Sequence, residues 1–107
     1  MSVALRKEEI KISYRRAMAT ANRFIMKNLP DRLSAGLPKS ICFPTRTVWI
    51  VPVLLTYPKV GIVGEVGMIA IEAGRENVVG WTPFSEVESL ARQLYQEKKN
   101  EIEIAFS

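Results

Sequence analysis

Few residues in this sequence could carry chemistry, because it has no histidine and only one cysteine, Cys42. Histidine is the commonest general base and metal ligand, and a lone cysteine cannot build a zinc site. The carboxylates of Asp31, Glu65, Glu72 and Glu76 have no partner group at a spacing typical of acid or base catalysis. We therefore predict a protein that is not an enzyme and has no cofactor or metal, with Cys42 buried between apolar neighbours.

Three glycines recur at every third position, at Gly61, Gly64 and Gly67. A phosphate-binding loop leads into a helix N-terminus, where free amide groups meet the phosphate. The apolar residues 68–71 that follow these glycines are instead typical of a strand. We therefore expect the glycines to serve turns, bulges or close backbone approach.

Charge is distributed unevenly along the chain. Residues 1–47 hold ten Lys/Arg against three Asp/Glu, a net of +7, and residues 48–107 hold five against eight, a net of −3, which together give +4. Within a predicted N-terminal helix the cations share one face, which holds Lys11, Arg15, Arg16, Arg23 and Lys27. This face could bind a protein partner or phosphates, or it could simply be solvated.

Nucleic acid is a possible but not favoured partner of that basic face. The sequence contains no helix-turn-helix, zinc-finger or aromatic RNA-binding motif. The salt-dependent attraction of phosphates to cations is therefore the only argument for such binding.

Apolar periodicity places an amphipathic helix at residues 4–27. Its predicted buried stripe consists of Ile10, Tyr14, Ala17, Met18, Ala21, Phe24 and Ile25. Residues 28–47 contain three prolines and are expected to form a connection with at most one short turn. The β-branched and aromatic runs that follow predict an antiparallel meander of three to four strands, at about 47–56, 65–73 and 78–81.

Within the first of these strands, Pro52 is expected at an edge or a bulge, because proline cannot donate to a ladder. Trp49 and Trp81 are expected in the sheet core or at its rim.

A second helix is predicted to follow the sheet and to pack on it. Its start is marked by Thr82 as N-cap with Pro83 at the first helical position, or by a competing capping box from Ser85 to Glu88. Its predicted apolar face consists of Val87, Leu90, Ala91, Leu94 and Tyr95.

The end of the chain alternates between apolar and acidic residues. Ile102, Ile104 and Phe106 fall on one side of an extended chain, with Glu101 and Glu103 on the other. We interpret this segment as a short edge strand or docking tail, and the three apolar residues as a tentative self-association site.

The stretch Ile71-Glu72-Ala73-Gly74-Arg75-Glu76-Asn77-Val78-Val79 resembles the strand, turn, strand signature of PepSY-like small domains. Glu72 stands where an aspartate is usual, and Arg75-Glu76 stands where Thr-Gly is usual. The layout of the whole chain is similar to that of small uncharacterised bacterial proteins. The resemblance implies a helix-on-sheet interaction or inhibitory module, and it transfers no site residue.

Together these features predict a single α+β domain over residues 1–107. The apolar stretch 48–71 contains prolines and charges, which favours two strands over a membrane span. The single cysteine and the polar start of the sequence indicate a cytoplasmic protein.

For function, we predict a non-enzymatic protein-interaction or regulatory module that forms a homodimer or other homo-oligomer. The predicted contact is a sheet edge or the C-terminal segment. A nucleic-acid-binding protein and a small-ligand-binding domain are the alternatives.

Overall fold

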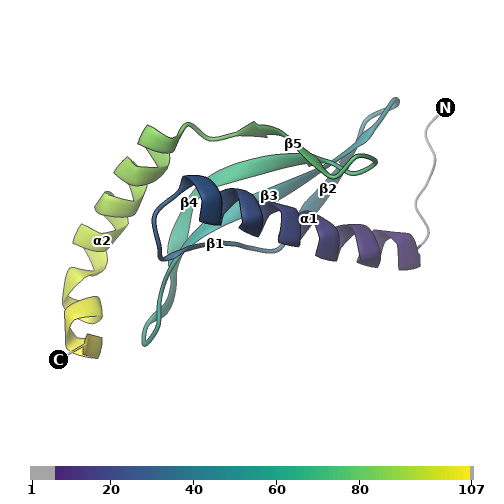
Figure 1. Ribbon diagram of the computed structural model, residues 1–107. Coiled ribbons are helices and arrows are strands. Elements are labelled where there is room, and N and C mark those ends of the chain that lie inside the picture. The colour runs from purple at the N-terminus through teal and green to yellow at the C-terminus, as the bar shows by residue number, and fades with distance from the viewer. Residues whose placement is uncertain (1–6, 107) are drawn as a thin grey trace.

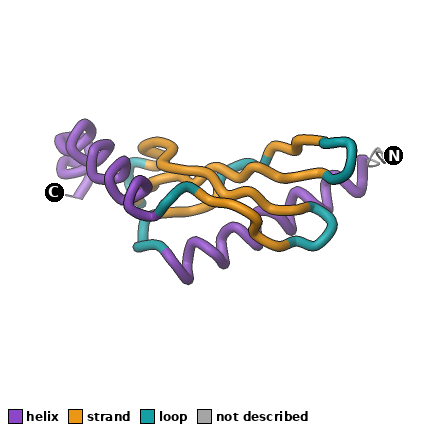
Figure 2. The backbone as a smooth tube through the Cα atoms, turned by 90° about the horizontal axis from the view of Figure 1, so that it is seen from above, coloured by secondary structure: helices purple, strands orange, loops and turns teal. Residues whose placement is uncertain are grey.

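The protein folds into two helices and one curled antiparallel sheet, which confirms the predicted α+β class (Figure 1). This computed structural model describes the backbone of residues 7–106 and the side chains of residues 14–105. In chain order the elements are α1 (Lys7–Asn28), β1 (Leu33–Ala35), β2 (Lys39–Cys42), β3 (Thr47–Tyr57), β4 (Gly61–Glu72), β5 (Asn77–Trp81) and α2 (Phe84–Phe106). Figure 2 shows α1 along one side of the sheet and α2 across one end.

Strands β3, β4 and β5 form the predicted meander. One side of β3 pairs with β4, and the other side pairs first with β2 and then with β1. Residues 28–47 therefore contain two strands, and the prediction of a connection with at most one short turn is wrong. Pro38 and Pro44 lie just outside β2, so the prolines limit the lengths of the strands without preventing their pairing.

Pro52 lies opposite the gap between β1 and β2. Its carbonyl oxygen accepts a hydrogen bond from the N–H of Gly36 at 2.8 Å, whereas its own nitrogen has no proton to donate. In an antiparallel ladder the N–H and C=O groups of one residue point toward the same neighbouring strand. The N–H group that proline lacks would therefore point into the gap between β1 and β2. β3 is an inner strand, and the register shifts of the β3–β4 ladder lie after Val53 and after Leu55. The prediction of an edge or a bulge at Pro52 is therefore wrong, because the gap between β1 and β2 accommodates the missing donor.

One face of the sheet packs against the helices, and we call it the covered face. Its β3 residues alternate along the strand, as the pleat requires, and the whole buried cluster consists of Trp49, Val51, Val53, Leu55, Ala35, Val66, Ile69, Ile71, Val87, Ala17, Ala21 and Ile25. Tyr14, Met18 and Phe24 pack at its margin. The predicted stripe of the first helix is thus confirmed from Tyr14 to Ile25, and the Ile10 side chain lies outside the described residues.

The glycines that recur at every third position serve a turn and a close approach, as predicted. Gly61 has a φ of 89° next to the turn between β3 and β4. At two places in the β3–β4 ladder, β4 has one extra residue that has no partner on β3. Because one extra residue lies between Gly64 and Gly67, these glycines share the covered face although they are three residues apart. A Cβ would lie 2.8 Å from Leu94 at Gly64 and 3.0 Å from Val87 at Gly67. The absence of a side chain at Gly64 and Gly67 therefore allows α2 to pack closely against β4.

Gly67→Ala is expected to lower the free energy of unfolding by about 1–3 kcal/mol through overpacking. The added methyl would lie 3.0 Å from Val87 Cγ2 and 3.1 Å from Thr82 Cβ, and both side chains are β-branched and stiff. Gly74→Ala is the matched control, because nothing lies within 4 Å of its Cβ position. Urea unfolding measures both variants, and equal stabilities would contradict the close approach of α2.

Helix α2 begins at Phe84, one residue after the start predicted at Pro83 and before the competing capping box at Ser85. The carbonyl of Pro83 accepts the N–H groups of Glu86 and Val87, whereas the hydroxyl oxygen of Thr82 accepts the N–H of Met68 at 2.9 Å. Thr82 therefore joins the end of β5 to β4 instead of capping the helix. Of the predicted apolar face, four residues are buried or half-buried and Leu90 is exposed.

The last residues continue α2 to Phe106, and the prediction of a terminal strand or docking tail is wrong. Segment 98–106 contains no proline or glycine and is rich in lysine, glutamate and other residues that a helix accommodates. Because successive residues turn by 100° on a helix, Ile102 and Ile104 lie on different sides. Ile102 is 3% exposed and Ile104 is 72% exposed.

The structure also tests the predictions for the tryptophans, for Cys42 and for the apolar segment 48–71. Trp49 is buried in the core and Trp81 lies half-exposed at the rim, as expected. Cys42 is exposed, which contradicts the prediction of burial, because it ends an edge strand whose residues all face solvent. Over residues 7–106 neither helix is long and apolar enough to span a membrane, and segment 48–71 forms the predicted two strands.

Candidate functional site

The predicted basic face lies on the outward side of α1. Arg15, Arg16, Arg23 and Lys27 are exposed, on the side of the helix opposite the buried alanines. Lys11 belongs to the same helix, but its side chain lies outside the described residues. The sequence therefore placed the four described cations correctly on one face.

Two of these cations make contacts within the chain. Arg16 Nη1 lies 3.0 Å from Glu76 Oε1 and joins α1 to the turn between β4 and β5. Arg23 Nη2 donates a hydrogen bond to Thr20 Oγ1 at 3.2 Å. Exposed ion pairs contribute at most about 1 kcal/mol, so the Arg16 contact can open at small cost. It nevertheless lowers the charge that this face presents to phosphates.

The predicted C-terminal association site does not form one apolar row. Ile102 is buried outside the main core cluster, and Ile104 lies on another side of α2. The Phe106 side chain lies outside the described residues. A surface that combined these residues would need the extended backbone that the structure does not have.

The face of the sheet opposite the covered face forms a second candidate site, which we call the open face. Its register positions carry a continuous apolar set, which consists of Ile41, Val48, Ile50, Pro52, Leu54, Ile62, Met68 and Ala70. Ile62 is 66% exposed and Met68 is 50% exposed. Figure 2 shows no helix along this side of the sheet.

The sequence of β3 is apolar on both faces of the sheet. An antiparallel sheet with one solvated face alternates between apolar and polar residues, whereas strands buried on both faces are apolar throughout. Residues 48–55 are apolar at every position. The covered face accounts for every second one of these residues. Among the others, Val48 is also buried, at 6% exposed, and Ile50, Pro52 and Leu54 are half-buried.

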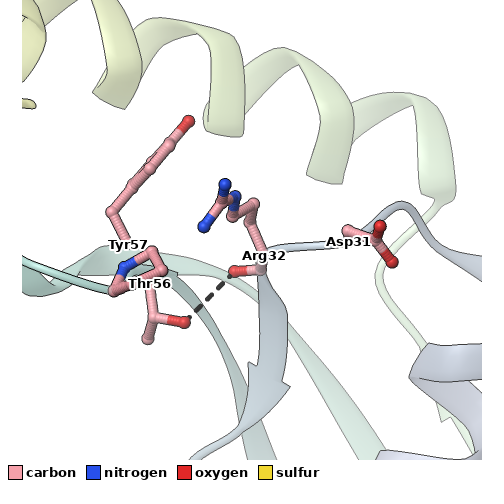
Figure 3. A pocket seen from close by; sticks show the side chains of 5 residues that line it. Asp31, Arg32, Thr56 and Tyr57 are labelled. Atoms are coloured by element: carbon pink, nitrogen blue, oxygen red, sulfur yellow. Dashed lines mark hydrogen bonds between the residues drawn. The ribbon is translucent and has the colours of Figure 1, made fainter. Parts of the chain in front are cut away.

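A third candidate site is a cleft between α2 and the loop that joins α1 to β1, which we call the Arg32 cleft. It consists of two adjoining hollows of about 430 and 500 Å³ that share Asp31, Arg32 and Tyr57. Leu33, Leu55 and Ala91 are among the apolar residues of its wall, and Arg92 and Tyr95 enter from α2. Figure 3 shows Arg32 and Tyr57 directed toward the underside of the helix.

The backbone of Arg32 is held in an unusual conformation. Its φ of 79° lies in the left-handed region, which a non-glycine residue occupies at a cost. The carbonyl oxygen of Arg32 accepts hydrogen bonds from the Thr56 N–H at 2.8 Å and from the Thr56 hydroxyl at 3.4 Å. These contacts hold the strained residue in place, and such strain often accompanies a functional site.

Sequence reasoning did not find the Arg32 cleft. Its wall comes from segments 30–33, 55–58 and 88–96, which only the fold brings together. The sequence of α2 contained one weak signal of the cleft. Polar and apolar residues share one face of this helix at spacings of three and four, and these residues are Glu88, Ala91, Arg92 and Tyr95. Among the side chains of residues 14–105, no group of three or more Cys, Asp or Glu residues is arranged to hold a metal ion.

Comparisons of this chain with protein-family models, curated proteins and solved structures find no match. The similarity to PepSY-like domains therefore stays a prediction. The strand, turn, strand arrangement that it implied is present, as β4, residues 73–76 and β5.

Proposed function

We propose that this protein is a non-enzymatic interaction module, located in the cytoplasm, that pairs with a second copy of itself through the open face. The observation that carries the proposal is the apolar surface of β3 and β4 on the side of the sheet without helices. Exposed apolar surface of this extent on a small domain is typical of an interaction site. The predicted contact through the C-terminal segment is not retained, because its residues do not share a face.

The charges of the open face favour a second copy as the partner. In a two-fold dimer the same patch contacts itself, so a patch of one sign would repel its copy. The open face carries Lys39 beside Ile50 and two glutamates, Glu65 and Glu72, on β4. Both signs are therefore present around an apolar centre.

The shape of the single chain supports the same proposal. Its radius of gyration is 15.6 Å and its extents are 55 × 27 × 21 Å, whereas a compact domain of this length has a radius of about 13 Å. A flat, elongated chain that covers one side of its sheet buries less apolar surface than a compact one. A second sheet packed on the open face would supply the missing layer.

Met68→Lys is expected to convert the dimer into a monomer, because the lysine would place a charge at the apolar centre of each open face. Size exclusion with light scattering at about 100 µM, above the dissociation constant of a micromolar dimer, should give twice the chain mass of 12.1 kDa for the natural protein. The variant should give the single-chain mass.

The matched control is Met26→Lys, which makes the same change at a residue of α1 that is 82% exposed. This control should remain a dimer. A natural protein that is monomeric at that concentration would refute self-association. A dimer that persists in Met68→Lys would place the contact elsewhere, such as at a sheet edge, and would refute the role of the open face.

A further inference from the structure

We propose that the Arg32 cleft binds a small organic anion that carries a flat aromatic ring. The cleft lies on the helix side of the sheet, away from the open face, so this inference is independent of self-association. Its volume is within the range of small-ligand pockets, which are mostly apolar with a few placed polar groups. The chemistry of its wall indicates the class of ligand.

The anionic part of the ligand is inferred from two guanidinium groups. Arg32 enters the cleft from the loop before β1, and Arg92 enters from α2, which forms the opposite wall. Each guanidinium offers several N–H donors in a fixed plane, and such groups bind carboxylates and phosphates in a bidentate manner. An anion between the two walls would contact both.

Two carboxylates, those of Asp31 and Glu88, also belong to the wall of the cleft. Asp31 also borders the cleft, but Figure 3 shows its carboxylate directed away from Arg32 and Tyr57. Glu88 lies on α2 one turn before Arg92, and Tyr95 lies almost one turn after it. Glu88 is therefore a neighbour of Arg92 on the same face of α2, and Tyr95 lies on the other side of Arg92 along the helix.

The aromatic part of the ligand is inferred from the two tyrosines. The rings of Tyr57 and Tyr95 lie with their centroids 6.1 Å apart at an angle of 39°, one on each wall. The Arg32 guanidinium lies over the Tyr57 ring, 5.2 Å from its centroid, in a cation–π contact. A ligand ring packed against the two tyrosines would therefore place its anionic group near the arginines.

The test is a titration of the full-length, ¹⁵N-labelled protein with 1-naphthyl phosphate, followed by amide chemical shifts. Inorganic phosphate and 1-naphthol are the two comparison probes, because each has only one half of the proposed chemistry. We expect 1-naphthyl phosphate to bind at least about tenfold more tightly than either one. The largest shifts should fall on residues 30–33, 55–58 and 88–96.

Arg92→Gln is expected to weaken the binding of 1-naphthyl phosphate by about tenfold, because it removes a charged donor from one wall. Arg32→Gly should have a similar effect while it keeps the backbone conformation, which glycine adopts freely. The matched control is Arg75→Gln in the turn between β4 and β5, an exposed arginine outside both the cleft and the basic face, which should bind as the natural protein does.

Three results would overturn the inference. One is the absence of shifts at about 5 mM probe, because the dissociation constant would then lie above the millimolar range. The second is shifts centred on the open face, which would show ordinary apolar adsorption. The third is unchanged affinity in Arg92→Gln. None of these results bears on the oligomeric state, so failure here and failure of the proposed self-association are separate outcomes.

Discussion

Replacing Trp49 with alanine is expected to lower the free energy of unfolding by about 3–5 kcal/mol, as large-to-small changes of buried aromatic residues do. Trp49 is 3% exposed and lies in the cluster between α1 and β3. Its ring makes an edge contact with Tyr14 of α1, with centroids 6.4 Å apart. The variant would therefore lose a large buried side chain that joins the first helix to the sheet.

The conservative change Trp49→Phe is expected to cost much less, within about 1.5 kcal/mol. The indole N–H of Trp49 is buried and makes no hydrogen bond within the described part of the chain. A buried donor without a partner carries a penalty of about 1–3 kcal/mol, and phenylalanine removes it. The relief offsets part of the volume lost with the smaller ring.

The control for Trp49 is Trp81→Ala. Trp81 is 51% exposed and contacts Phe24 and Phe84 at the rim, so its loss should cost no more than about 2 kcal/mol. Urea unfolding followed by far-ultraviolet circular dichroism, at one fixed protein concentration, compares the variants without relying on tryptophan fluorescence. A Trp49→Ala cost no larger than that of Trp81→Ala would contradict the placement of Trp49 in the core.

Elements with strong local signals were predictable from the sequence. The stripe of α1, the meander and most of α2 follow from apolar periods that match their packing. The strands β1 and β2 were missed because Pro30, Pro38 and Pro44 mark a loop locally. Their pairing depends on the free side of β3, which is a partner far along the chain.

The candidate sites divide in the same way. The cations of α1 share a face because they belong to one helix, so spacing alone identified that face. The open face required the strand register, although the uninterrupted apolar run of β3 already suggested a strand buried on both sides. The Arg32 cleft depends on three separate segments and on the left-handed φ of Arg32, neither of which spacing reveals.

Ile102→Ala is expected to lower the free energy of unfolding by about 2–5 kcal/mol, because it removes most of a buried side chain. The same change at Ile104 should alter it by less than about 0.5 kcal/mol, since Ile104 is 72% exposed. Alanine is also a better helix former than isoleucine, which could even give Ile104→Ala a slight gain.

This pair of variants separates the two conformations of the chain end. In the extended segment that the alternation predicts, the two isoleucines share one side and would lose similar stability. In the helix they differ by 200° and only one is buried. Urea unfolding of both variants at one protein concentration, with circular dichroism at 222 nm as the signal, makes the comparison. Equal losses would show that α2 ends before Ile102, because only an extended backbone aligns both side chains.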